Sequence, residues 1–564
     1  MTKLITIQEA TPLSDSIRYQ LSDITWQWGE TAFFSEKVPF SGRSNPKFAS
    51  HLSKLYQAHI NALPSELPTY HVYEFGAGLG LLSKHFLDHL KETAPEIYKK
   101  TILHVTELSS STVKKLQEIS IFYDHIDQVR FQTMNATNIS FDETQKPIFA
   151  FSSYLLSSLS TKLILSKNNK LEELYVKTSL PEDSKIIDTT TYPPQILNTN
   201  QIKTLLEKND TTTLKIIGTK IKKILQEEYI TININNSNLT TKSKDEITSF
   251  ATNKDINNNS YFSFNTALKK HIKQVTDGLA ENGVYFVSDL GKPTLNTTNF
   301  KLLLANYGGT ASTCLSFPQF KTITSALNLD LLSTTRTTHD TQEVLIGKSI
   351  NKPLKKSFNS LFSVCPLENI QKSLDKLNKL DKNNSNPEQV NIAIANLSAT
   401  ERKDYLLLKR AAAILFKSGH LANASKFTAE SHKIYLEYAI DAFLITGWIC
   451  QKQGFHNDAT ICFKQAIQIC PNMHILHSSL ASSQIAQNLL PECITSFKKA
   501  IRFSKDKEIW DYTLGIGVNY KRIGKIAEAN ETFSWPLEIL KKHPNLIPVD
   551  RAAEIKSYFN LTTN

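Results

Sequence analysis

The chain has 564 residues, of which 40% are hydrophobic, and it carries a formal net charge of +11. A chain of this length is expected to form two or three domains with sizeable cores. Its basic residues form no arginine-rich or aromatic-interleaved cluster, which argues against nucleic-acid binding. It has no apolar run of the ~18 residues that a membrane helix needs, and its N-terminus has no apolar signal segment. We therefore expect a cytoplasmic protein that does not enter a membrane.

Residues 1–70 precede the first strand of the predicted α/β sheet. They include the aromatic stretch TWQWGETAFF at 25–34. Two interpretations of this extension stay open: a cap over a bound cofactor, or a packing extension of the sheet. The six cysteines of the whole chain include no C-x-x-C pair, so we expect no metal or redox site.

The stretch His71–Asp88, HVYEFGAGLGLLSKHFLD, predicts a buried strand, a glycine-rich turn and a helix. Its turn residues are Gly76, Ala77, Gly78 and Gly80. This spacing differs from the dinucleotide fingerprint G-x-G-x-x-G, which places a pyrophosphate at the helix N-terminus. Glu74, two residues before the turn, would repel a pyrophosphate but attract a cation. The pattern E-x-G-x-G-x-G resembles motif I of the class I S-adenosylmethionine (SAM)-dependent methyltransferases; a glycine-rich turn of another α/β domain is the alternative.

A second acidic residue ends the next predicted strand, ILHVTEL at 102–108. In this fold the acid at that position accepts hydrogen bonds from both ribose hydroxyls, so we expect Glu107 to bind the ribose, with Leu108 beside it. A solvated strand-end carboxylate is the alternative. The third predicted strand, at 129–135, ends with Met134 and Asn135, which would meet an adenine ring. The predicted cofactor-binding residues are therefore Glu74, Gly76, Ala77, Gly78, Gly80, Glu107, Leu108, Met134 and Asn135.

The α/β domain is predicted to extend over residues 71–350. The stretch 148–153 predicts its fourth strand and GVYFVSDLG at 283–291 its fifth, with Asp289 at the ligand end of the sheet. A polar stretch at about 171–261 predicts an insertion with secondary structure of its own. Residues 351–402 include the charged, asparagine-rich run LDKLNKLDKNNSNPEQ and are predicted to be a linker.

Residues 403–564 repeat at a period of about 34 residues, which is typical of tetratricopeptide (TPR) helix pairs. Small or turn-forming residues recur at equivalent positions, among them Gly419, Gly454, Asn488 and Gly524. We expect four copies and a capping helix at 552–559; a generic helical bundle is the alternative. The predicted fold is an α/β Rossmann-like class I methyltransferase domain followed by an all-α TPR solenoid.

Residues 30–350 resemble the MidA-like group of class I SAM-dependent methyltransferases. The matching pieces are GRSNPKFASHLSKLY before the sheet, EFGAGLGLLSKHFLDHL, HVTELSSSTVKKLQ, SDLG at 288–291 and TCLSFPQFKTI at 313–323. The mitochondrial member of this group is a complex I assembly factor, and the resemblance implies methylation of a protein side chain, arginine in that member. The chain departs from the group at 153–160, where SYLLSSLS replaces an N-E-x-F-D-A-L-P-like segment. The acid that would bind a guanidinium is therefore absent.

The sequence thus predicts a methyltransferase that uses SAM and acts on a protein acceptor recruited by the TPR groove, without nucleic-acid or membrane partners. An inactive SAM-binding or TPR scaffold is one alternative, and a nucleotide-dependent oxidoreductase is a weaker one. No catalytic residue is assigned, because Asp289, Tyr154 and His85 each favour a structural role. The oligomeric state is not predicted.

Overall fold

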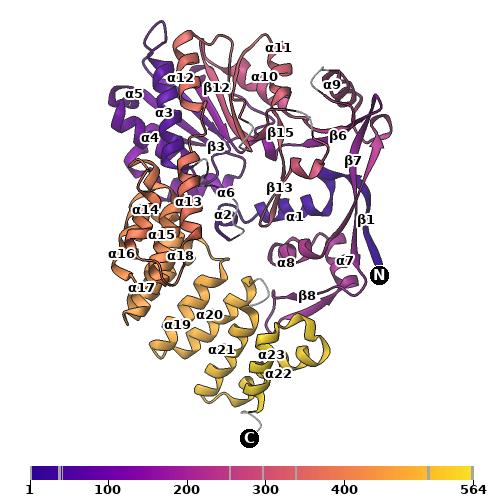
Figure 1. Ribbon diagram of the computed structural model, residues 1–564, viewed down its shortest axis with the longest axis vertical. Coiled ribbons are helices and arrows are strands. Elements are labelled where there is room, and N and C mark those ends of the chain that lie inside the picture. The colour runs from indigo at the N-terminus through magenta and orange to yellow at the C-terminus, as the bar shows by residue number, and fades with distance from the viewer. Residues whose placement is uncertain are drawn as a thin grey trace.

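The computed structural model describes residues 3–35, 40, 42, 44–252, 256–294, 297–336, 340–504 and 508–560. Its central element is an eight-stranded sheet near the top of Figure 1. The main path of this sheet runs β16 (Asp330–Ser333), β17 (Thr341–Gly347), β12 (Val284–Lys292), β5 (Phe149–Ser153), β2 (Tyr70–Phe75), β3 (Thr101–Glu107) and β4 (Val129–Thr133), and β15 (Leu315–Ser316) pairs with β12. The strands from β12 to β4 are parallel, and β17 is antiparallel to both neighbours. The predicted Rossmann-like sheet is confirmed.

Helices cover both faces of this sheet. Successive side chains of each strand point to opposite faces, and both sets are apolar. One set packs with α3 (Pro46–Ile60), α4 (Leu81–Thr93) and α12 (Lys352–Phe362). The other packs with α10 (Leu268–Gly278) and α11 (Phe317–Ala326). The turn between β2 and α4 lies at the carboxyl edge of the parallel strands, where ligands bind in open α/β sheets. Shorter helices α5 (Pro95–Lys100) and α6 (Ser110–Glu118) flank β3 in sequence.

A second sheet lies at the upper right of Figure 1 and contains the predicted insertion. Its strands are β1 (Leu4–Pro12), β6 (Thr161–Lys167), β7 (Lys170–Pro181), β10 (Gln226–Asn233) and β11 (Ser260–Asn265). Its helices and associated hairpins are α1 (Ile17–Trp26), α7 (Thr199–Glu207), α8 (Thr211–Ile224), α9 (Thr241–Ala251), β8–β9 (Lys185–Asp188 and Gln195–Asn198) and β13–β14 (Leu304–Tyr307 and Thr310–Thr313). The insertion therefore begins near residue 161, and the N-terminal extension supplies β1 to the second sheet and α3 to the first.

The prediction that residues 351–402 form a flexible linker is wrong. It forms α12, α13 (Glu368–Lys379) and α14 (Pro387–Ile394). Phe358 and Phe362 of α12 are buried in the core of the first sheet, and Leu377 and Val390 are buried beside the next helix, α15 (Tyr405–Lys417). The charged residues that suggested a linker are exposed, on the solvent faces of α13 and α14 and in the turn at 380–386 between them. Composition alone does not separate this pattern from a coil.

Four helical hairpins follow, as the repeat predicted. They are α15–α16 (Tyr405–Lys417, Leu421–Tyr435), α17–α18 (Ile440–Lys452, His456–Ile469), α19–α20 (His474–Ala486, Leu490–Phe503) and α21–α22 (Glu508–Arg522, Ile526–Lys542), and α23 (Val549–Asn560) ends the described chain. The turn residues Gly419, Gly454, Asn488 and Gly524 all have positive φ, the conformation that favours Gly and Asn. Gly447 lies against the Phe463 ring, where a Cβ would approach to 2.4 Å, so a small residue is required there.

The helical region shares one hydrophobic core with the first sheet. Lys84 of α4 donates to the Ile434 carbonyl, and the rings of His85 and Tyr435 lie 5.5 Å apart. On the other side, the β8–β9 hairpin reaches the last repeats, where the Tyr192 hydroxyl donates to Thr532. The hairpins are therefore packed against the α/β part from two directions. Among the residues that the structure describes, we find no helix with both the length and the apolar character that a bilayer crossing requires.

Candidate cofactor and acceptor site

The glycine turn after β2 has the conformation that its sequence predicts. Gly76, Gly78 and Gly80 have φ of 68°, 55° and 68°. A Cβ on Gly76 would lie 2.8 Å from the Leu155 side chain, and one on Gly80 would lie 3.0 Å from Leu116. The turn is closed by the Ala77 amide, which donates to the carbonyl of Thr106 at 3.0 Å. The glycines thus allow a close approach of the turn to its neighbours.

Glu107 lies at the end of β3 and is tied to this turn. One carboxylate oxygen accepts from the Gly78 amide at 3.0 Å, and the other accepts from the Leu108 amide at 2.7 Å. A carboxylate has about four acceptor positions, so further donors can bind to the same oxygens. The side chain is partly exposed, and Leu108 is largely exposed. Glu107 therefore fits the hydroxyls of a ribose while it holds the turn.

Glu74 lies beneath the turn and does not face solvent. It is 2% exposed, and it accepts from the Ser83 hydroxyl in the first turn of α4. Burial raises the pKa of Glu74 to about 8, and the nearby charge of Glu107 adds to this increase. A cation that approached the turn would favour the charged form of Glu74, as its predicted role requires. Within the chain itself, Glu74 connects β2 to the start of α4.

Met134 and Asn135 follow β4 near the same edge. The Met134 amide donates to the Glu107 carbonyl at 2.9 Å, and its side chain packs against the core. The Asn135 side-chain oxygen accepts from the Thr137 amide and hydroxyl at 2.8 and 2.9 Å. Glu107, Met134 and Asn135 are thus brought to one edge of the sheet, with the oxygen of Asn135 used in its own loop.

A short helix, α2 (Thr31–Ser35), covers the turn. The Phe33 ring lies 3.3 Å from the position that a Cβ on Gly78 would take. The Trp26 ring packs edge-on against Phe33, with centroids 5.5 Å apart. Of the two interpretations left open by the sequence, this geometry favours the cap for residues 31–35.

The segment after β5 is held by Asp289 from β12. The Asp289 carboxylate is fully buried and accepts from the amides of Leu156 and Ser157 at 2.7 and 3.2 Å. Burial raises the pKa of Asp289 to about 6. Tyr154 has φ of 53°, an uncommon conformation for an aromatic residue, and its amide donates to the Ser288 carbonyl. Asp289 therefore has the structural role that its sequence context favours.

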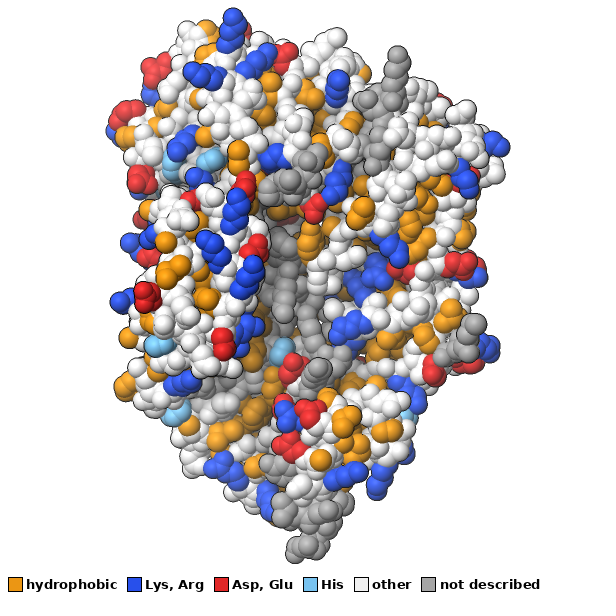
Figure 2. Space-filling model, viewed as in Figure 1, with side chains coloured by type: hydrophobic (Ala, Val, Ile, Leu, Met, Phe, Trp, Pro, Cys, Tyr) orange, Lys and Arg blue, Asp and Glu red, His pale blue; other side chains and the backbone are white. Residues whose placement is uncertain are grey.

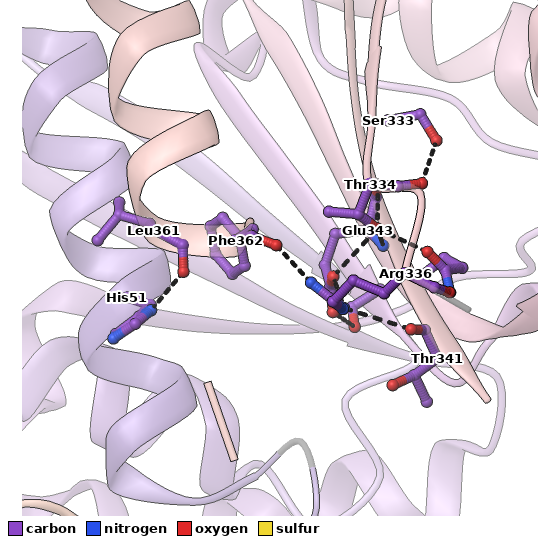
Figure 3. Close-up of polar contacts among 10 residues, drawn as sticks. His51, Ser333, Thr334, Arg336, Thr341, Glu343, Leu361 and Phe362 are labelled. Atoms are coloured by element: carbon purple, nitrogen blue, oxygen red, sulfur yellow. Dashed lines mark hydrogen bonds and ion pairs between the residues drawn. The ribbon is translucent and has the colours of Figure 1, made fainter. Parts of the chain in front are cut away.

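The structure adds an ion pair that the sequence did not indicate. Figure 3 shows Arg336 between the carbonyl of Phe362 and the carboxylate of Glu343. Glu343 is fully buried in β17, and its other oxygen accepts from the Ser288 hydroxyl at 3.2 Å. The only sequence signal is a glutamate inside the apolar strand TQEVLIG.

His85 does not belong to the site. It lies on α4 between Asp88 and Tyr435, on the side of the helix that meets the helical hairpins. Burial lowers its pKa, so its neutral form is favoured. Within the described ranges, no group of three or more His, Cys, Asp or Glu side chains could hold a metal ion.

Comparison with known proteins finds one matching family model and several solved structures. Residues 52–316, slightly less than half of the chain, match the model of a family described as "Putative S-adenosyl-L-methionine-dependent methyltransferase". No curated protein matches the chain. A protein from Burkholderia thailandensis described as a likely methyltransferase, solved with S-adenosyl-homocysteine, is 13% identical over 62% of this chain and 90% of its own, with a TM-score of 0.39. The methyltransferase CcbJ from Streptomyces caelestis is 9% identical over 58% and 98%, with a TM-score of 0.29.

Both structural similarities are too weak to carry an argument. The type of domain is therefore inferred from the family model and the sheet topology. The described sheet contains the strand, glycine turn and helix that the matched range includes. Residues 52–316 therefore carry a methyltransferase-like α/β domain, and the family match supports S-adenosyl-L-methionine as its cofactor.

Proposed function

We propose that this protein is an active SAM-dependent methyltransferase that acts on a protein acceptor. The observation that supports it most directly is the carboxylate of Glu107, fixed to the glycine turn at the end of β3. In this proposal the turn 76–80 takes the methionine part of the cofactor, Glu107 the ribose, and Met134 and Asn135 the adenine. Glu74 compensates the positive charge. SAM, when bound, supplies the methyl group, and the chain aligns the acceptor and excludes water.

The binding part of the proposal can be tested by calorimetry on the full chain with SAM and, separately, with NAD. We expect SAM to bind and NAD not to bind. Glu107→Ala should weaken SAM binding by about 1–3 kcal/mol, the scale for hydrogen bonds to charged groups. Gly78→Leu should abolish it, because its side chain would meet Phe33. Glu96→Ala, on the exposed surface, is the matched control. NAD binding without SAM binding would favour the oxidoreductase alternative.

Basic side chains on one face of the molecule support a protein acceptor. Figure 2 shows lysine and arginine side chains on both sides of the middle of this face. Lys215 and Lys223 of α8 lie at a cavity whose wall includes Trp28. A basic surface of this kind attracts an acceptor segment rich in acidic residues. Arginine is not part of the proposal, because Asp289 and Glu343 are both buried and bound to the chain's own donors.

We also propose that the helical hairpins form a TPR-like array that recruits the acceptor through its groove and edge. Successive hairpins expose the apolar residues Phe455, Leu489 and Ile526 near their turns. Exposed apolar side chains in a row are typical of protein-binding surfaces. Recruitment would raise the local acceptor concentration at the site.

Removal of the repeats would not test recruitment, because it would uncover the core shared with α4. The test is Phe455→Asp with Leu489→Asp in the full chain, followed by transfer of radiolabelled methyl groups to proteins in a lysate of the source cells. We expect unchanged SAM binding and slower labelling, restored at high acceptor concentration. Equal labelling at every concentration would contradict recruitment.

A non-catalytic scaffold is the second candidate. It is favoured by the absence of acids at 153–160 and by the internal hydrogen bonds of Glu74 and Glu107. SAM binding with no labelled protein in any fraction would support the scaffold over the enzyme.

A further inference from the structure

The cap helix α2 is too short to be stable alone. Five residues form about one helical turn, and isolated helices below ~12 residues are marginal in water. Ala32 and Phe34 are buried, so neighbouring elements determine where α2 lies. Its position matters because Phe33 contacts the glycine turn.

The helical hairpins supply several of these neighbouring contacts. The Phe34 and Tyr438 rings are stacked with centroids 6.0 Å apart, and the Tyr438 hydroxyl donates to Glu30, just before α2, at 3.0 Å. At the other end of α2, the side-chain NH₂ of Asn472 donates to the Ser35 hydroxyl at 2.9 Å. Both ends of the cap are therefore bound by residues more than 400 positions away in sequence.

Glu30 extends this connection to the cofactor side of the sheet. Its second carboxylate oxygen accepts from Lys115 of α6 at 2.9 Å. The helix α6 begins three residues after Glu107, which holds the glycine turn. Glu30 and Tyr438 are both buried, so water and salt screen their interaction only weakly.

The turn that carries Tyr438 has an unusual backbone. Leu436, two residues earlier, has φ of 49° and ψ of −124°, an unfavourable conformation for a leucine. The neighbouring Glu437 accepts from the Ser120 amide at 3.1 Å. A strained residue persists only where surrounding contacts fix it, and such residues cluster at functional positions.

We propose that the C-terminal helical region positions the α2 cap over the cofactor site, with Tyr438 as the positioning residue. The hairpins then control how long the cofactor is retained, a role separate from recruitment of an acceptor. Loss of the Tyr438–Glu30 hydrogen bond allows α2 to leave the glycine turn more often. The identity of the retained ligand as SAM rests on the function proposed above, whereas the position of the cap does not.

The test compares Tyr438→Phe with Tyr435→Phe in the full chain. Both variants keep the ring and lose one hydroxyl; the Tyr435 hydroxyl donates to the Lys403 carbonyl at 2.8 Å, inside the helical region. SAM dissociation is followed by tryptophan fluorescence, since Trp26 packs on Phe33. Amide hydrogen exchange of residues 31–35 is measured without ligand.

For Tyr438→Phe we expect about tenfold faster SAM dissociation, the change that about 1.4 kcal/mol produces. The KM for SAM should rise with little change in kcat, and residues 31–35 should exchange about tenfold faster. Tyr435→Phe should match the wild type in each measurement. Unchanged exchange in Tyr438→Phe would overturn the proposal, as would faster exchange with unchanged SAM dissociation. If the wild type binds no SAM, the proposed function fails, and exchange alone decides whether Tyr438 holds the cap.

Discussion

The two halves of the sheet's carboxyl edge use acidic residues in opposite ways. On the cofactor half, Glu107 is partly exposed and its oxygens have room for further donors. On the other half, formed by the ends of β5 and β12 and by β17, Asp289 and Glu343 are fully buried and accept from the chain itself. We call it the acceptor half, because the proposed acceptor would bind there. An acid at a strand end is therefore no guide to ligand binding until its burial and its donors are known.

The contacts of Asp289 and Glu343 explain why these acids are buried. The segment 154–158 turns sharply after β5, and two of its amides are satisfied by Asp289. Buried backbone amides need such partners. Next to it, Glu343 would be a buried charge without compensation if Arg336 were absent. Both acids hold this edge together, whereas Glu107 also leaves a surface for a ligand.

The largest expected effect is the loss of Arg336. Arg336→Met should lower the free energy of unfolding by about 3–5 kcal/mol, because it leaves Glu343 buried without its cation. Urea denaturation measures this change. Lys273→Met, which breaks the exposed pair with Asp277, should cost at most about 1 kcal/mol.

The double variant Arg336→Met/Glu343→Met sharpens this prediction. If the cost comes from the uncompensated carboxylate, the double variant should be more stable than Arg336→Met alone. A double variant as unstable as the single one would mean that packing at this position, and not charge, determines stability.

The next effect concerns Glu74 on the cofactor half. Its pKa in the folded state is about 8, above the ordinary value of 4.5, because it is buried. The folded state therefore binds the proton more tightly than the unfolded state. The stability that Glu74 contributes is fully present below pH 4.5 and is lost as the pH rises toward 8. The total loss over this range is about 4–5 kcal/mol.

Glu74→Gln should remove this pH dependence. The difference in unfolding free energy between the variant and the wild type should increase in favour of the variant from pH 5 to pH 8. Denaturant curves at several pH values measure it. If the two proteins gave parallel pH profiles, Glu74 would not be protonated in the folded protein.

The sequence predicted the cofactor half better than the acceptor half for a physical reason. Strand, glycine turn, helix and strand-end acid are local features, so the turn with Gly76 and Gly78 and the position of Glu107 at a strand end could be predicted from spacing alone; their binding of a cofactor stays a prediction. The Arg336–Glu343 pair depends on the packing of α12, which the sequence suggested was part of a linker. The hairpins were recognisable from their period, but their contact with α2 joins residues that no local pattern connects.

The smallest expected effect on stability, and the sharpest test of the acceptor half, is at Tyr154. The described non-glycine residues with positive φ are all asparagines except Tyr154 and Leu436. Replacement by glycine removes backbone strain and also removes the side chain, so Tyr154→Gly should change stability by no more than about 1 kcal/mol.

Retention of a strained aromatic residue directly after β5 is expected if its side chain meets the acceptor. We therefore expect methyl transfer to fall at least about tenfold while SAM affinity stays the same, as about 1.4 kcal/mol of lost transition-state stabilisation implies. Asn488→Gly, at a hairpin turn with φ of 59°, is the matched control and should leave transfer unchanged. If Tyr154→Gly transferred methyl groups at the wild-type rate, the Tyr154 side chain would have only a packing role on this half of the edge.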